Sequence, residues 1–354
     1  MNYLRNAWTV AAWARELEPG KLLARTLLDE PLVFFRDHEG HPQALHDCCP
    51  HRFAPLSMGR LCDGGAAVQC PYHGLRFDGS GACVHNPHGD GRIPVAAKVR
   101  RYPVVERFSA IWIWMGAEAL ADPARIPDFS FNDPEHYAVG TGTMVIDAPY
   151  DLEIDNILDL SHIEFMHPLF SSEAVRRGQV SFEHEVDTVW CKRFMAEDCE
   201  VPDFLRQAFQ VPDGSIDRWL DVRWNAPAVM ALWAGGVAHG REKEEGIVSQ
   251  QAHCFTPVSP TQALYFYSFS VPRAIGPMAQ AVADQNVQML RGPFEHEDKP
   301  IVEAVARRMA GRDLLDLKPV LLPGDAAAVR ARRLLQALIQ KEATADGAHG
   351  SASA

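Results

Sequence analysis

The chain lacks three features that would place it in a membrane, on the secretion pathway or on nucleic acid. No apolar run in its 354 residues approaches the about 20 residues that span a bilayer. Its first residues lack a basic stretch followed by an apolar segment, which is the pattern of a secretion signal. The net charge of −12 disfavours general binding to nucleic acid, which requires clustered lysine and arginine. We therefore expect a cytoplasmic protein with no membrane partner and no nucleic-acid partner.

A nucleotide-binding motif is also missing, and the cysteines lack the context of a disulfide framework. The sequence has no G-x-G-x-x-G followed by an acidic residue in a βαβ unit, so we expect it to bind neither NADH nor flavin. The chain contains eight cysteines but has no secretion signal at its start. They are therefore interpreted as thiols and metal ligands rather than as a disulfide framework.

The length of the chain favours two domains. From Pro31 to Gly116 short apolar runs alternate with turn residues, which is typical of an all-β domain. The run Ala110–Gly116 is rich in β-branched and aromatic residues and predicts a buried strand at the end of this domain. A polar, proline-bearing stretch over 121–134 reads as a linker. We expect a first domain over 1–120 and a second over 121–341.

The second domain is predicted to be α+β with an antiparallel sheet. Strand-like segments lie at Thr143–Asp147, Val189–Phe194 and Ala263–Val271. Helical regions are expected around 151–166 and from about 278 to 310. The end of the chain, 342–354, is rich in Ala, Gly, Ser and Thr and is predicted to be a disordered tail.

Two short motifs in the first domain have the composition of a metal site. Cys49-x-His51 and Cys70-x-x-His73 are separated by eighteen residues. Each motif combines one cysteine with one histidine, whereas a zinc finger typically pairs like with like. A [2Fe–2S] centre in which two cysteines hold one iron and two histidines hold the other needs this mixed arrangement. A structural zinc site is the alternative reading of the same spacing.

A second group of polar residues opens the second domain. Asp155, Asp159 and His162 are spaced i, i+4 and i+7, so on one helix they share a face. His162 and His167 are about 140° apart on a regular helix, so both reach one ion only if the helix unwinds between them. Pro168 favours this, because it places His167 at or beyond the helix end. Non-haem Fe(II) is typically bound by two histidines and one carboxylate, so His162 and His167 are candidate iron ligands. The alternative interpretation is that they are ordinary polar residues of the surface.

These motifs together resemble the Rieske non-haem iron oxygenases. Cys49-Pro50-His51-Arg52 and Cys70-Pro71-Tyr72-His73-Gly74 are similar to the cluster loops of that family. Ala54 and Tyr72 stand where respiratory Rieske proteins carry a disulfide. The chain looks most like the vanillate O-demethylase-like monooxygenase branch. The resemblance implies an all-β Rieske domain followed by a catalytic domain of helix-grip, START-like fold.

The resemblance also implies the ligands of both metals. A [2Fe–2S] cluster in each subunit is held by Cys49, His51, Cys70 and His73, and one Fe(II) is held by His162, His167 and a carboxylate from a late helix. Asp298 is the match for that carboxylate. Glu295 and Glu297 remain rivals because Pro293 and Pro300 bracket a segment that is more continuously helical in relatives.

Further roles follow from the same resemblance. Relatives are head-to-tail homotrimers, which implies that His73 of one subunit hydrogen-bonds Asp159 of the next and that Asp159 contacts His162. Asp159 as a carboxylate that only orients His162 within one chain is compatible with this. Asn156 is expected near the iron, with an ordinary helix-face asparagine as the alternative. His253 matches a position that faces the substrate in some relatives, with a structural histidine as the alternative.

The implied activity is oxidative O-demethylation of a methoxylated aromatic acid with O₂ and with electrons from a separate NADH-dependent flavin and ferredoxin reductase. Hydroxylation of an aryl methyl group or of the ring is the alternative enzyme reading. A Rieske electron-transfer protein and a zinc-stabilised scaffold are the non-enzymatic alternatives. Four aromatic and apolar residues of the late strands suit an aromatic ligand, although an ordinary core role is the favoured interpretation: Leu232, Trp233, Phe255 and Phe266.

Overall fold

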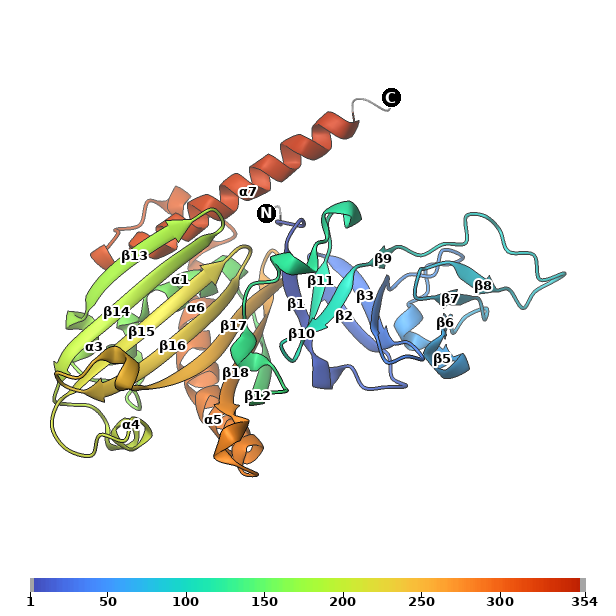
Figure 1. Ribbon diagram of the computed structural model, residues 1–354. Helices are drawn as coiled ribbons and strands as arrows, with labels where there is room; N and C mark the ends of the chain where they lie inside the picture. The colour runs from blue at the N-terminus through green and yellow to red at the C-terminus, as the bar shows by residue number, and fades with distance from the viewer. Residues whose placement is uncertain (1–2, 351–354) are drawn as a thin grey trace. The chain divides into compact units, whose positions relative to one another are not determined.

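The computed structural model describes residues 3–350, and the chain divides into two compact units (Figure 1). One unit consists of Arg5–Ile126 together with Thr256–Ser259. The other contains Pro127–Phe255 and the residues from Pro260 onward, together with the residues before Arg5. The division therefore falls within the segment 121–134 that the sequence predicts as a linker.

The first unit is built from three small antiparallel sheets, which confirms the all-β prediction. One sheet has the order β1 (Trp8–Trp13), β11 (Ala110–Trp114), β10 (Val104–Arg107). The second has the order β2 (Leu23–Leu27), β3 (Glu30–Arg36), β4 (Pro42–His46), β9 (Arg101–Tyr102). The third has the order β5 (Arg60–Cys62), β6 (Ala67–Gln69), β7 (Arg76–Asp78), β8 (Cys83–His85). The predicted strand at Ala110–Gly116 is β11, and all five of its residues are buried.

A hydrophobic core beneath the third sheet fixes the two cysteine motifs. Phe77 and Val68 are fully buried there, and Cys49 and Cys70 belong to the same cluster. Cys49 lies in the connection between β4 and β5, and Cys70 lies in the connection between β6 and β7. Burial of this apolar cluster therefore holds both connections in one place.

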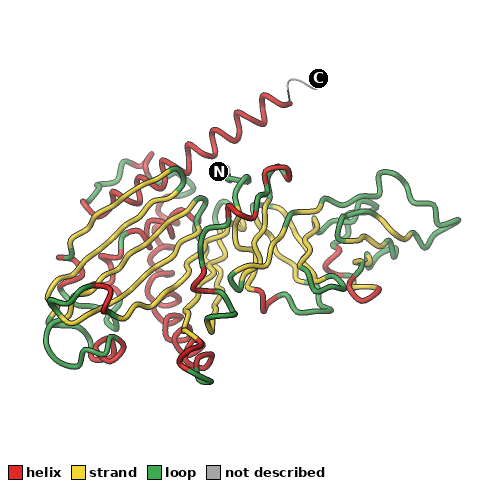
Figure 2. Tube along the Cα trace, viewed as in Figure 1, coloured by secondary structure: helices red, strands yellow, loops and turns green. Residues whose placement is uncertain are grey.

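The second unit contains a seven-stranded sheet, and its strands and helices are distinguished by colour in Figure 2. The strand order is β12 (Tyr137–Ile146), β18 (Gln262–Pro272), β17 (Ile247–Ser259), β16 (Val229–Ala238), β15 (Ile216–Asn225), β14 (Thr188–Asp198), β13 (Gln179–Glu185). Antiparallel pairing runs from β13 to β17 and joins β12 to β18. The α+β prediction and its three strand segments are confirmed, since those segments fall within or overlap β12, β14 and β18.

The second unit also contains seven α-helices among the described residues, several of which pack on the sheet. They are α1 (Tyr150–Leu158), α2 (Ile163–Met166), α3 (Ala174–Arg177), α4 (Asp203–Ala208), α5 (Ala279–Pro293), α6 (Lys299–Met309) and α7 (Ala326–Gly350). Helix α5 packs on β12 and β18, whereas α7 packs on β13, β14 and α1. Gly140 allows β12 and α5 to pack closely, because a Cβ at this position would lie 2.3 Å from the carbonyl oxygen of Ala283 in α5. Among the described residues, no helix is long and apolar enough to cross a membrane.

Both predicted helical regions exist, but each is interrupted. The first is split at Asp159, whose φ of −122° and ψ of 88° end α1 before a 3₁₀ turn over Leu160–His162. The second runs from α5 into α6 through a π-helical turn over Phe294–Asp298. The predicted disordered tail also differs, because α7 continues to Gly350; residues 351–354 lie outside the described residues. Alanine is the best helix former, and this segment contains several.

Candidate cluster and iron sites

The two Cys-His motifs form loops of the same shape. In the first loop the amide of Cys49 donates to the carbonyl of Ala54 at 2.9 Å, and the amide of Phe53 donates to the carbonyl of Cys49 at 2.8 Å. In the second loop Cys70 and Leu75 repeat the first bond at 2.8 Å, and Gly74 donates to Cys70 at 3.2 Å. The residue after the turn has a positive φ in both loops, 59° at Phe53 and 75° at Gly74. The loops are therefore equivalent halves of one binding site.

The donor atoms of these loops suit a [2Fe–2S] cluster. Burial, together with the neighbouring Cys70, raises the pKa of Cys49 to about 11, so a thiolate pair needs a cation to be stable there. The imidazole rings of His51 and His73 lie 4.5 Å apart between centroids. The Nδ1 atom of His73 is buried and has no hydrogen-bond partner among the described residues. An unpaired buried nitrogen is costly unless it binds a ligand.

The candidate iron site is assembled from two distant segments of the second unit. His162 ends the 3₁₀ turn, and His167 follows α2 directly with a non-helical φ of −118°. The predicted effect of Pro168 on His167 is therefore present, but the main unwinding occurs before His162, at Asp159. Asp298 comes from the π turn 131 positions after His167 in the chain and is buried. Ligand atoms of His162, His167 and Asp298 all lie within 4.8 Å of one another.

Both imidazoles are oriented by a second partner, which leaves the Nε2 atoms for a metal. His162 Nδ1 lies 2.8 Å from the main-chain carbonyl oxygen of Asp159, and His167 Nδ1 lies 2.6 Å from Glu297 Oε2. The Nε2 atoms are then 3.5 Å and 3.3 Å from the two oxygens of Asp298. Two histidines and one carboxylate on one side of an ion leave coordination positions open for O₂.

The two histidines differ in their electrostatics. Burial lowers the pKa of His162, which favours the neutral ligating form. Burial acts in the same direction on His167, but Asp298 and Glu297 outweigh it and raise its pKa. A metal at this site therefore competes with a proton on His167.

The three candidate carboxylates have different partners. Asp298 faces both histidines and accepts a hydrogen bond from Asn156 Nδ2 at 3.2 Å. Glu295 pairs with Arg291 at 2.7 Å on the surface. Glu297 contacts the Nδ1 atom of His167, on the side of the ring away from Asp298. The segment between the two prolines is a π turn, in which the amide of Lys299 donates to the carbonyl of Phe294; Pro293 is the last residue of α5, and Pro300 lies in the first turn of α6, where a proline is tolerated.

One predicted arrangement is wrong. Asp155, Asp159 and His162 do not share a helix face, because the helix ends at Leu158. Asp155 instead pairs with the buried Arg332 of α7 at 2.6 Å. The carboxylate of Asp159 pairs with Arg193 of β14 at 2.8 Å. The carboxylates of Asp155 and Asp159 therefore pair with different arginines, and Asp159 contacts His162 through its main chain.

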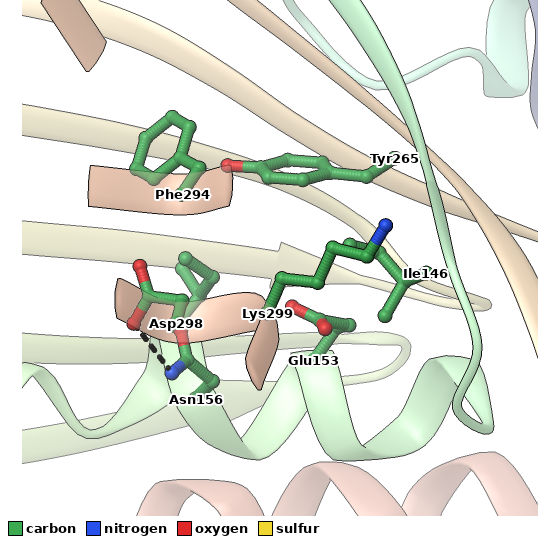
Figure 3. Close-up of a pocket in the computed structure, with 8 residues that line it drawn as sticks. Ile146, Glu153, Asn156, Tyr265, Phe294, Asp298 and Lys299 are labelled. Carbon is green, nitrogen blue, oxygen red and sulfur yellow. Dashed lines mark hydrogen bonds between the residues drawn. The ribbon is translucent and has the colours of Figure 1, made fainter. Parts of the chain in front are cut away.

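An aromatic cluster lies beside Asp298 (Figure 3). Tyr265 of β18 packs against Phe294 of the π turn at 5.4 Å between ring centroids, and Phe294 lies 5.8 Å from His253 of β17. Of the four predicted lining residues, Leu232 and Phe255 fall on this side of the sheet by strand alternation. Trp233 and Phe266 point to the other face, where Trp233 stacks on Trp190.

His253 is fully buried in this cluster. Its Nδ1 atom lies 2.6 Å from the hydroxyl of Tyr265, and its Nε2 atom has no hydrogen-bond partner among the described residues. Burial lowers the pKa of His253 to about 4, so the ring is neutral near pH 7. A neutral imidazole with one unused nitrogen offers a single hydrogen bond to a polar group.

Several residues of the site were missed by the sequence analysis. Tyr265 and Phe294 sit in segments that read as strand and helix with no polar motif. Glu153 was also missed: it is 3% exposed, and burial, followed by the charge of Asp298, raises its pKa to about 8. Its position two residues before Asp155 in an acidic helix is the only signal that the sequence offered.

Comparison with known proteins gives a family match for each of the two parts of the chain. Residues 7–103 match the Rieske [2Fe-2S] domain, and residues 146–341 match the vanillate O-demethylase oxygenase C-terminal domain. The dicamba O-demethylase oxygenase component of Stenotrophomonas maltophilia is 40% identical over 97% of this chain and 100% of its own length. A vanillate O-demethylase oxygenase subunit of Pseudomonas sp. (strain HR199 / DSM 7063) is 32% identical over 96% of this chain and 95% of its own.

Solved structures give the same assignment. Dicamba monooxygenase bound to 3,6-dichlorosalicylic acid superposes with a TM-score of 0.89 and 38% identity, covering 97% of this chain and 99% of that one. A structure of the same enzyme with non-haem iron and dicamba superposes with a TM-score of 0.81 at 38% identity, with coverage of 97% and 99%. This chain therefore belongs to the Rieske non-haem iron oxygenases, in the family of the vanillate O-demethylase oxygenase subunits.

Proposed function

We propose that this chain is the terminal oxygenase component of a multicomponent monooxygenase that removes the methyl group from a methoxylated aromatic acid. The main support for this proposal is that His162, His167 and Asp298 lie together beside a buried aromatic cluster. Relatives that act on dicamba and vanillate by O-demethylation support the reaction class. Overall, Ar–OCH₃, O₂, NADH and H⁺ give Ar–OH, formaldehyde, water and NAD⁺.

In this proposal each metal has its own ligand set. Cys49, His51, Cys70 and His73 hold the cluster, and His162, His167 and Asp298 hold Fe(II). The mononuclear iron supplies activation of O₂, and the cluster supplies one of the electrons. Asn156 fixes the carboxylate of Asp298 through its 3.2 Å hydrogen bond. Glu297 and the carbonyl of Asp159 fix the two imidazoles.

The substrate pocket is proposed to lie between β17, β18 and the π turn. Aromatic rings of Tyr265 and Phe294 suit the faces of an aromatic substrate. The unused Nε2 atom of His253 supplies one polar contact, which suits an oxygen of the substrate. A site with mostly apolar walls and few polar groups positions a ligand by those few groups.

A substrate panel tests the reaction. Methoxybenzoates, methylarenes and unmethylated aromatic acids are incubated separately with the chain, a compatible reductase, NADH and O₂. We expect formaldehyde and the corresponding phenol, in equal amounts, from a methoxybenzoate only. Conversion of methylarenes to benzylic alcohols, without formaldehyde from any methoxybenzoate, would instead establish hydroxylation of an aryl methyl group.

Metal content tests the ligand sets. The purified protein is expected to be brown and to contain two cluster irons per chain, plus up to one more iron at the second site. Iron and acid-labile sulfide assays, together with the visible spectrum, measure this. Stoichiometric zinc without acid-labile sulfide would contradict the cluster and favour the zinc-stabilised scaffold.

The assembly and its electron supply are also part of the proposal. We infer a head-to-tail homotrimer in which His73 of one subunit reaches Asp159 of the next, and a separate NADH-dependent flavin and ferredoxin reductase. The relatives are oxygenase components, which supports a separate reductase. The cytoplasmic location stays a prediction.

A further inference from the structure

The carboxylate of Asp159 is occupied on one oxygen only. Its Oδ1 atom accepts the amide of Ser161 at 3.0 Å and the Nη2 atom of Arg193 at 2.8 Å. Its Oδ2 atom accepts no hydrogen bond from any residue that the structure describes. A carboxylate has lone pairs on both oxygens, so Oδ2 can accept a further donor.

Arg193 is held so that it uses one oxygen of Asp159 and not both. The side chain leaves β14 and is 4% exposed. Its other terminal nitrogen, Nη1, donates to the main-chain carbonyl of Val175 at 2.9 Å. A guanidinium often binds a carboxylate through two parallel bonds, but here Val175 takes the second donor. The ion pair therefore orients the carboxylate of Asp159 but leaves its Oδ2 atom available to another hydrogen-bond donor.

Gly324 borders the other oxygen. It lies in the 3₁₀ turn Pro323–Asp325 before α7. A Cβ at this position would lie 2.7 Å from Asp159 Oδ2, which is closer than carbon and oxygen normally approach. The φ of Gly324 is outside the left-handed region, so its backbone does not require glycine. The absence of a side chain at Gly324 therefore leaves space beside Asp159 Oδ2.

We propose that Arg193 and Gly324 present Asp159 Oδ2 to an imidazole N–H from a second copy of this chain. Arg193 is the positioning residue, and Gly324 keeps the approach open. This inference rests on the proposed function, because the donor is His73 of the neighbouring subunit. The main-chain carbonyl of Asp159 lies within hydrogen-bond distance of His162 Nδ1. Asp159 would therefore connect the imidazole bound at its Oδ2 atom with a ligand of the iron.

Gly324→Ala tests the inference in the intact oxygenase. Both metals are first reduced, and the protein is then mixed with O₂ and substrate while the visible absorption reports reoxidation of the cluster. We expect reoxidation to slow by about tenfold or more, within the range seen for residues that support a metal site. Iron content, the oxidised cluster spectrum and reduction by the reductase should not change.

Two controls isolate the contact with Asp159. Gly292→Ala is the matched variant, because the Cβ it would add has no atom within 4 Å apart from its chain neighbours and the backbone of its own helix. Electron transfer from the cluster in this variant should proceed at the wild-type rate. In an Asp159→Ala background, Gly324→Ala should add no further slowing, since the atom it would crowd is gone. A wild-type rate in the Gly324→Ala single variant, or full additivity in the double variant, would overturn the role of Gly324.

The role of Arg193 has its own test. Arg193→Gln should slow reoxidation of the cluster while the spectrum is retained, and Arg193→Lys should recover part of the rate. A wild-type rate in Arg193→Gln would overturn the positioning role. If Asp159→Ala itself transfers normally, the proposed bridge is wrong; if Asp159→Ala is slow but Gly324→Ala and Arg193→Gln are normal, only this further inference fails.

Discussion

Asp159→Ala is expected to lose most coupled turnover while both metals stay bound. The hydrogen bond to His162 Nδ1 comes from the main-chain carbonyl of Asp159, which alanine also has. The variant therefore removes the carboxylate but keeps the partner that orients the iron ligand. We expect kcat to fall on the order of 100-fold, and iron and sulfide analysis to give wild-type values.

A second substitution separates charge from structure. Asp159→Ala leaves the buried Arg193 without its carboxylate, and breaking a buried pair costs about 3–5 kcal/mol. Asp159→Asn keeps an oxygen for Arg193 and loses only the charge and one acceptor. It should fold normally and still lose turnover. Near-normal turnover in Asp159→Asn and Asp159→Ala would exclude an essential bridge.

Mixed trimers test whether electrons cross between subunits. One chain type carries Cys70→Ser and lacks the cluster, and the other carries His162→Ala and lacks the iron. Activity in the mixture, absent from each variant alone, is expected if the cluster of one subunit serves the iron of its neighbour. An inactive mixture that is fully assembled would place the transfer within one chain.

The cluster loops were the most predictable part of the molecule. Their ligands lie within five residues of each other in each motif, so spacing alone brings a cysteine beside a histidine. The two loops meet because the cysteines join one hydrophobic core. Sequence patterns of strands predicted that core as an all-β unit, and no long-range contact had to be guessed.

The iron site was less predictable because its partners are far apart in the chain. Asp159 interrupts a segment whose composition favours one helix, and its non-helical backbone is fixed by Arg193 and Ser161. Arg193 sits in an ordinary strand pattern, so nothing local indicated the contact. Pro300, which the sequence analysis interpreted as an interruption of a helix, instead lies in the first turn of α6, directly after the π turn at Phe294–Asp298.

The pocket was predicted least well, since strand alternation decides which aromatic residues line it. Phe266 and Tyr265 are neighbours in β18 and equally aromatic, yet only Tyr265 faces Phe294. The register of β18 with β12 fixes that choice. A slip of one residue would exchange the two faces, and composition cannot distinguish the alternatives.

Asp298→Ala should strip or severely weaken the mononuclear iron and abolish activity toward every substrate. The carboxylate lies between the two imidazole Nε2 atoms, at 3.5 Å and 3.3 Å, and alanine leaves only two ligands. The cluster belongs to the other unit of the chain, so its spectrum and its reduction by the reductase should be unchanged. Iron analysis of the purified variant and the visible spectrum measure the two effects separately.

The neighbouring acids make graded controls for this prediction. Glu295→Ala removes only an exposed pair with Arg291 and should keep iron and activity. Glu297→Gln weakens the 2.6 Å contact that orients His167, so iron affinity should fall by about 10- to 100-fold without being lost. The order of iron loss is thus Asp298, then Glu297, then Glu295. Full iron in Asp298→Ala together with an iron-free Glu297→Gln would move the third ligand to Glu297 and leave both histidines in place.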